Sequence, residues 1–158
     1  MNTDFQIQAL DHHHFLPYMQ KTDFQLQAQG AKWLEVTAHP GFPCRVTLQD
    51  AKVGERVLAI SFQHLPESSP YQSSGPVFVR EGALTTQLAV NEIPEVLPKR
   101  LLSLRGYDHQ HLMIEADVVE GRDIEAAIRK VFSNPLVNYL HIHNARPGCF
   151  ACAVKRAS

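Results

Sequence analysis

Residues 110–143 read QHLMIEADVVEGRDIEAAIRKVFSNPLVNYLHIH, and their pattern predicts two strands joined by a helix. The middle of this stretch predicts the clearest helix of the chain, over residues 123–132, because apolar side chains recur there with the period of an α-helix. They are Ile124, Ala127, Ile128, Val131 and Phe132. Strands are predicted on either side, over residues 110–120 and 138–143, so this helix connects two strands.

Further strands are predicted for residues 5–10, 33–37, 45–48, 56–63, 77–80, 99–105 and 149–155. A second helix over residues 23–29 is expected to begin after a Thr22 cap and to end at Gly30. The Ser- and Pro-rich residues 65–76 are predicted to form a long loop. Strands dominate, so we expect an α+β fold: a single domain over residues 1–158, with a mostly antiparallel mixed sheet and about two helices.

The composition is that of an ordinary globular protein and excludes several classes of partner. Fifteen Lys and Arg residues face sixteen Asp and Glu residues among 158, giving a formal net charge of −1. No basic surface is implied, so we expect neither nucleic acid nor a membrane as partner. The N-terminus lacks the pattern of a signal peptide, and no apolar stretch is long enough to span a bilayer, which predicts a cytoplasmic location. The oligomeric state is left open.

The C-terminal residues 141–152, HIHNARPGCFAC, gather the best metal ligands of the chain. Imidazole and thiolate groups suit zinc, so His141, His143, Cys149 and Cys152 are predicted as metal ligands and zinc as the candidate cofactor. Because side chains alternate along a strand, His141 and His143 share a face, whereas Cys149 and Cys152 are three residues apart and face opposite sides of a regular strand. A simple hairpin therefore brings only one cysteine to the histidines, and a complete site needs the last strand to bend.

Other interpretations of these residues stay open. A thioredoxin-like redox site is disfavoured, because only six residues follow Cys152 and they are too few for the helix that such a site needs. If residues 110–143 form a right-handed βαβ crossover, the helix covers Leu112 and Ile114, and His111 and Glu115 join the two histidines on the far face. A third interpretation is structural, with the polar motif only fixing the hairpin.

A competing hypothesis is a non-catalytic module that binds a small anion. The predicted ligand-binding residues are Cys44, Arg45, Tyr71, Ser74 and Arg80. Hydroxyl and backbone N–H groups of residues 65–76, with the two guanidinium groups, have the chemistry to hold a small anionic molecule. No fingerprint of a phosphate- or dinucleotide-binding loop occurs anywhere in the chain, so the ligand class and any reaction stay open.

Three motifs occur together: Pro43-Cys44-Arg45; Ser69-Pro70-Tyr71 through Ser74-Gly75-Pro76 and Phe78-Val79-Arg80; and the closing His141-x-His143-Asn144-x-x-Pro147-Gly148-Cys149-x-Ala151-Cys152. In these motifs the chain resembles an uncharacterised bacterial family, domain of unknown function 1203. The resemblance covers nearly the whole chain, and the closing motif is its most specific part. It implies a single stand-alone domain of about this length and carries over no activity.

Overall fold

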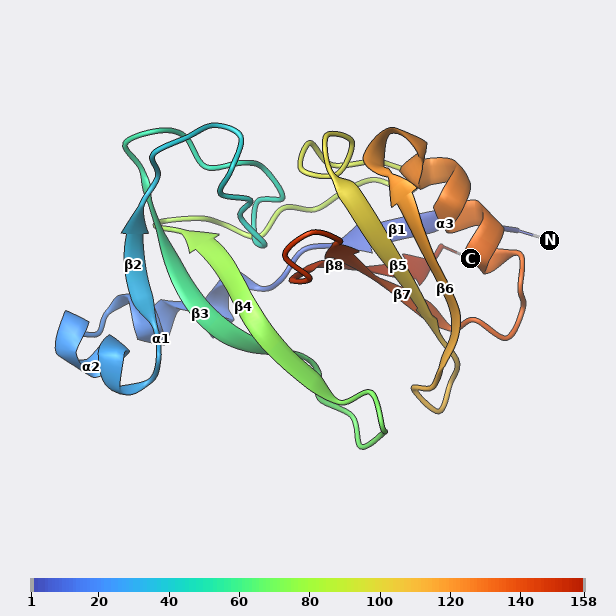
Figure 1. The fold of residues 1–158 in the computed structure, drawn as a ribbon, viewed down its shortest axis with the longest axis horizontal. Helices are drawn as coiled ribbons and strands as arrows, with labels where there is room; N and C mark the ends of the chain where they lie inside the picture. The colour runs from blue at the N-terminus through green and yellow to red at the C-terminus, as the bar shows by residue number, and fades with distance from the viewer. Residues whose placement is uncertain (1, 158) are drawn as a thin grey trace.

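The computed structural model describes residues 2–157 and contains two antiparallel sheets beside each other (Figure 1). The larger sheet has the strand order β1 (Phe5–Gln8), β8 (Phe150–Arg156), β7 (Tyr139–Asn144), β5 (Leu101–Tyr107) and β6 (Met113–Glu120). The smaller sheet has the order β2 (Lys32–Glu35), β3 (Arg56–Leu65) and β4 (Ser73–Arg80). The helical segments are η1 (His12–His14), α1 (Leu16–Met19), α2 (Asp23–Ala28), η2 (Gly121–Asp123) and α3 (Ile124–Phe132). The predicted α+β class is confirmed.

Residues 110–143 form a β-α-β unit, with one further strand inserted between its two strands. Strands β6 and β7 both pair antiparallel with β5, so they run parallel to each other on its two sides. Helix α3 connects them and lies across one face of the larger sheet (Figure 1). All five residues of its predicted apolar stripe are buried. Gly106 in β5 permits this close packing, because a Cβ there would lie 3.0 Å from Cγ1 of Val131.

The face of β6 that α3 covers differs from the prediction. Leu112 precedes the strand and Ile114 is the extra residue of an irregular pairing, and they are 36% and 38% exposed. The pairing of β5 with β6 is irregular near Gly106, which lies opposite Glu115. Glu115 therefore lies on the helix side, where its Oε1 accepts a hydrogen bond of 2.9 Å from Asn134. The expectation that Glu115 joins the histidines is wrong. Because the pairing is irregular between Met113 and Glu115, the side chains on the two sides of this point no longer alternate regularly, and Glu115 lies on the face opposite to the histidines.

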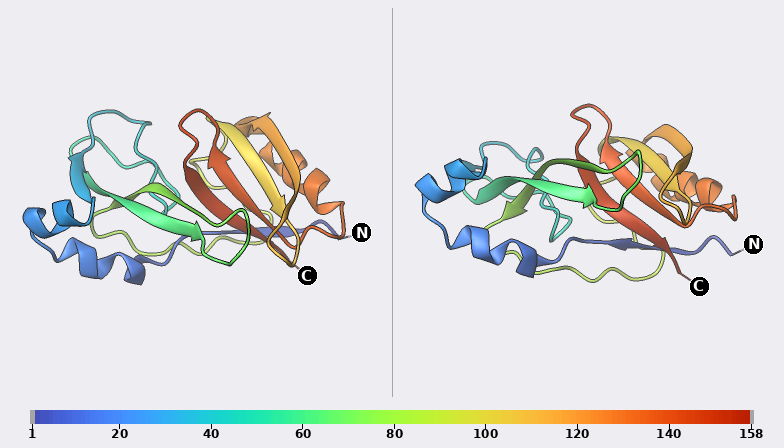
Figure 2. Two further views of the ribbon diagram at one scale, coloured as in Figure 1. Left: turned by 60° about the horizontal axis from the view of Figure 1, so that its bottom comes forward. Right: turned by 90° about the horizontal axis from the view of Figure 1, so that it is seen from below.

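Two other local predictions are corrected. Residues 45–48 form a turn instead of a strand, with a positive φ of 56° at Leu48 and a hydrogen bond from its N–H to the Cys44 carbonyl. The expected loop over residues 65–76 is shorter than predicted, because β3 extends to Leu65 and β4 begins at Ser73. Only residues 66–72 connect the two strands of this long hairpin, whose tip reaches toward the larger sheet (Figure 2).

The N-terminal helices α1 and α2 pack against the smaller sheet. The predicted Thr22 cap is confirmed: its hydroxyl accepts from the Gln25 N–H, and the Gln25 side chain accepts from the Thr22 N–H. Leu26 of α2 and Phe15 are buried in this half of the core, which also receives Phe150 from the larger sheet. Phe150 thus links the two halves. No helix within residues 2–157 has the length and apolar character needed to cross a bilayer.

Candidate functional site

A bulge in the β7–β8 hairpin decides where the side chains of the closing motif point. Ile142 pairs with Cys152, but the next residue, His143, pairs with Phe150, so Ala151 is the extra residue. A bulge of this kind redirects the side chains that follow it. Phe150 consequently lies on the same face as His143, while Cys152 lies with Ile142 on the face that α3 covers.

The structure brings together two of the four predicted metal ligands. His141 and His143 share a face, as the alternation of a strand requires. Cys152 is buried in the core beneath α3, and burial raises the pKa of its thiol to about 12. Cys149 lies beside Asn144 at the end of the hairpin, where the two residues share a backbone hydrogen bond. Neither cysteine reaches the histidine face. With the bulge in place, Cys152 lies opposite Ile142 and Cys149 opposite Asn144, and these two residues alternate with the histidines along β7.

A third histidine, His64 at the end of β3, takes the place that the cysteines were expected to fill. Its ring lies 4.9 Å from the ring of His143 and 5.9 Å from that of His141, centroid to centroid. Phe150 packs against all three imidazoles at 5.1 to 5.8 Å. No prediction placed His64 with these two histidines, because they belong to the other sheet. The only local signal was its alternation with Phe62, which also packs against Phe150.

Burial keeps this histidine cluster, formed by His64, His141 and His143, in the neutral state. The side chains of His141 and His143 are 6% and 1% exposed. Loss of solvation lowers the pKa of His141 to about 3 and that of His143 to about 4. The pKa of His64 is lowered by burial and by the positive charge of Arg105. The cluster therefore offers neutral imidazole nitrogens at physiological pH.

A pocket of about 580 Å³ lies at the turn of the β7–β8 hairpin. Its lining comes from both sheets and from the turn before Asp50: Gly41, Pro43, Arg45, Pro76, Val77, Phe78, Lys99, Arg100, Leu101, Glu120, Asn144, Arg146, Pro147 and Cys149. The walls carry four basic side chains against one carboxylate. Cys149, which the sequence predicted as a metal ligand, faces this pocket instead.

Arg45 is the central cation of this pocket, and it is only 2% exposed. Its Nε donates to the Phe150 carbonyl at 2.8 Å, its Nη1 to the Pro43 carbonyl at 2.7 Å, and its Nη2 to Sγ of Cys149 at 3.0 Å. No ion pair joins it to a carboxylate within residues 2–157. Burial lowers the pKa of Arg45, and the neighbouring Cys149 sulfur opposes that effect. A buried cation without a carboxylate requires another source of negative charge.

Arg100 lies in the same wall, but unlike Arg45 it has a carboxylate partner, Asp50. Its Nη2 donates to Asp50 at 2.6 Å and its Nη1 at 3.2 Å, and Lys99 lies 3.1 Å from the same carboxylate. Burial alone would raise the pKa of Asp50, but hydrogen bonds from Arg100 and Lys99 hold it below its ordinary value. This network braces the pocket wall. It leaves Arg45 and the exposed Arg146 as the cations available to a ligand.

The other residues predicted to bind an anion are dispersed. Cys44 is buried, and its sulfur accepts from the backbone N–H groups of Thr47 and Arg80. The Arg80 side chain turns toward the Glu81 carbonyl and Glu55. Tyr71 lies at the hairpin tip, with its ring against Tyr107, and Ser74 is exposed near that tip. Of these five residues, only Arg45 lines the pocket.

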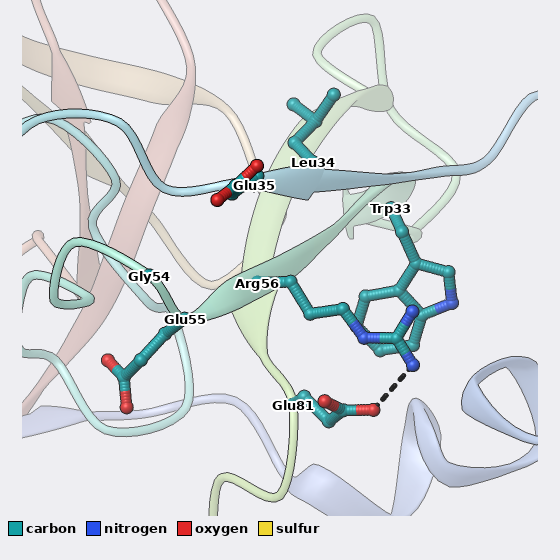
Figure 3. Close-up of a pocket in the computed structure, with 7 residues that line it drawn as sticks. All are labelled: Trp33, Leu34, Glu35, Gly54, Glu55, Arg56 and Glu81. Carbon is teal, nitrogen blue, oxygen red and sulfur yellow. Dashed lines mark hydrogen bonds and ion pairs between the residues drawn. The ribbon is translucent and has the colours of Figure 1, made fainter.

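A smaller pocket beside β2 and β3 has a single cation in its lining, Arg56. Figure 3 shows the Arg56 guanidinium over the Trp33 ring and turned toward Glu81. The guanidinium lies 4.0 Å from the ring centroid, and its Nη2 lies 2.6 Å from the Glu81 carboxylate. Both interactions satisfy the cation, so this pocket has no counterpart of the Arg45 guanidinium.

Comparison with known proteins agrees with the motifs that hold these two sites. Residues 41–156 match the family described as "Protein of unknown function (DUF1203)". The chain belongs to this family. No curated protein and no solved structure was found to match it. The DUF1203 segment contains the whole histidine cluster and all the pocket residues, whereas β1, α1, α2 and β2 precede it.

Proposed function

We propose that this DUF1203 protein binds a small anionic molecule in the pocket between the sheets, with the anionic group at Arg45 and Arg146 and the Cys149 thiol beside it. The observation that carries this proposal is the buried guanidinium of Arg45, which lines the pocket and lacks a carboxylate partner in the described chain. Arg45 belongs to both the expected anion site and the proposed one. Residues of the β7–β8 hairpin take the place of Tyr71, Ser74 and Arg80.

The free hydrogen-bonding capacity of Arg45 supports anion binding. A guanidinium has five N–H groups, and three of those of Arg45 are used within the protein. One N–H on each terminal nitrogen therefore remains for a ligand, and this pair suits a carboxylate or phosphate group. The pocket volume of about 580 Å³ lies within the range of small-molecule sites.

Cys149 gives the proposed site a reactive group. Its sulfur lies 3.0 Å from Nη2 of Arg45, beside the proposed position of the anionic group. Asn144 also donates to this sulfur, at 3.5 Å. All three cysteines are free thiols. We place the protein in the cytoplasm, where reducing conditions keep such thiols available.

The test compares alkylation of Cys149 by anionic iodoacetate and neutral iodoacetamide, measured peptide by peptide with mass spectrometry. An anion-binding pocket concentrates iodoacetate beside the sulfur, so we expect folding to raise the iodoacetate-to-iodoacetamide rate ratio about 10-fold over that in urea. Inorganic phosphate should slow the iodoacetate reaction. Cys44 and Cys152 serve as internal controls, because both are buried and should stay unmodified in the folded protein.

Arg146→Ala removes the exposed cation of the pocket, and Arg122→Ala removes an exposed arginine outside it. The first substitution should lower the rate ratio several-fold, and the second should leave it unchanged. An identical ratio in folded and unfolded protein, or equal effects of the two substitutions, would show that the pocket does not select anions.

A further inference from the structure

We propose that His64, His141 and His143 together form a binding site for a transition-metal ion, for which Zn²⁺ is the test ion. This site is distinct from the anion pocket and does not depend on it. It revises the ligand set expected from the sequence: the two histidines of the closing motif remain, His64 joins them, and Cys149 and Cys152 leave.

The first argument is that each imidazole of the cluster has one buried nitrogen without a hydrogen-bond partner. These atoms are Nδ1 of His64, Nδ1 of His141 and Nε2 of His143, and they are the complete set of such side-chain atoms in the described residues. Buried polar atoms are normally hydrogen-bonded, and each exception is destabilising. Three exceptions in neighbouring rings indicate that one missing partner serves all three.

The second argument is that the opposite ring nitrogens of two of the histidines are held as they are in metal ligands. Nδ1 of His143 lies 3.0 Å from the Gly148 carbonyl, which can only accept, so this nitrogen carries the proton. Nε2 is then the atom with the free lone pair. Nε2 of His64 bonds to the Ser73 hydroxyl at 2.8 Å, which holds the ring and leaves Nδ1 as its second nitrogen. Metal-binding histidines almost always have such a partner on the second nitrogen.

The third argument concerns the kind of ion. Three imidazoles suit zinc, copper and nickel and are a poor site for calcium or magnesium, which prefer oxygen. Three protein ligands leave the fourth tetrahedral position for water or a small anion. Arg105 lies opposite His141 on the same face of the sheet, and its positive charge favours an anion there.

Binding requires a local closing movement. The three nitrogens do not all lie within 4.8 Å of one another, a criterion that only Asp11, His12 and His13 meet in the described chain. His64 is the ligand best placed to move, because it is half-buried and lies where the pairing of β3 with β4 is irregular. The movement would draw the β3–β4 hairpin onto the larger sheet.

The test titrates untagged, chelator-treated full-length protein with Zn²⁺ in a calorimeter and follows its melting temperature. We expect one ion per chain, a higher melting temperature, and a loss of affinity of at least 100-fold in His64→Phe. Phenylalanine keeps the ring that stacks on Phe150 but removes the ligand atom. Ser73→Ala removes only the orienting hydroxyl and should weaken binding about 10-fold.

The matched control is the double variant His12→Ala/His13→Ala, which removes the surface group and should keep the site. Co²⁺ gives a second readout, because tetrahedral nitrogen ligation produces visible d–d bands without a sulfur charge-transfer band. Several outcomes would overturn the proposal: wild type that neither takes up zinc nor gains thermal stability, affinity unchanged in His64→Phe, affinity lost in the surface variant, or a cobalt–sulfur band. Should His64→Phe fail to fold, Ser73→Ala and the cobalt spectrum of the wild type still decide.

Discussion

The two faces of the five-stranded sheet bury different kinds of side chain. On the α3 face, Leu104, Leu140 and Ile142 are fully buried among apolar neighbours. On the opposite face, His141 and His143 are nearly as buried, yet each retains a polar atom without a partner. The first arrangement stabilises the fold, because apolar burial is favourable. The second costs stability, and proteins keep such arrangements where a site needs them.

The largest effect that tests this difference comes from truncating adjacent residues of β7. Ile142→Ala leaves a cavity under α3 and should lower the free energy of unfolding by about 3 kcal/mol. His143→Ala also removes a buried ring, but it removes an unpartnered nitrogen as well, so its loss should be less than half as large. Urea unfolding in chelator, followed by circular dichroism, measures both. Equal losses would mean that the two faces contribute alike.

A second test uses acid, to which the histidine face should respond as the pH falls from 6.5 to 4. The folded-state pKa values of His141 and His143, about 3 and about 4, lie below the unfolded value of 6.5. The unfolded chain therefore binds protons first, and the stabilisation present above pH 6.5 is lost as the pH falls toward 4. Each histidine contributes a slope of up to about 1.4 kcal/mol per pH unit.

The matched variant for this titration is His141→Phe, which keeps an aromatic ring and removes one titrating group. Its free energy of unfolding in chelator should fall less steeply from pH 6.5 to 4 than that of the wild type. Parallel curves for the two proteins would mean that His141 does not titrate as its burial requires.

The sequence predicted the α3 face better than the histidine face, and the reason is physical. The stripe of α3 and the Thr22 cap depend on residues within a few positions of one another, so local spacing reveals them. The placement of Phe150, Glu115 and the two cysteines depends on irregular strand pairing, which no local pattern specifies. The partnership of His64 with His143 and the contact of Arg45 with Cys149 join segments far apart in the chain. The sequence shows these residue types, but it does not show that they lie close together in the fold.

The smallest effect is expected at the rim of the histidine face. The Tyr139 hydroxyl lies 2.8 Å from Nδ1 of His111, and Tyr139 stacks on Tyr107 at 5.2 Å. Tyr139→Phe keeps the stacked ring and removes only this hydrogen bond, so the free energy of unfolding should fall by about 1 kcal/mol. Tyr18→Phe is the control, because the Tyr18 hydroxyl makes no hydrogen bond inside the described part of the chain, and its unfolding should not change.

A double-mutant cycle separates this bond from other effects of the lost hydroxyl. His111 has a positive φ of 63°, which asparagine adopts readily, so His111→Asn removes the imidazole without backbone strain. If the hydrogen bond accounts for the loss, Tyr139→Phe should cost almost nothing in the His111→Asn background, giving a coupling energy of about 1 kcal/mol. Additive losses would instead assign the effect to solvation of the hydroxyl. In that case a polar group of this face would contribute the same free energy with or without a hydrogen-bond partner. The missing partners of the histidine nitrogens would then no longer indicate a site.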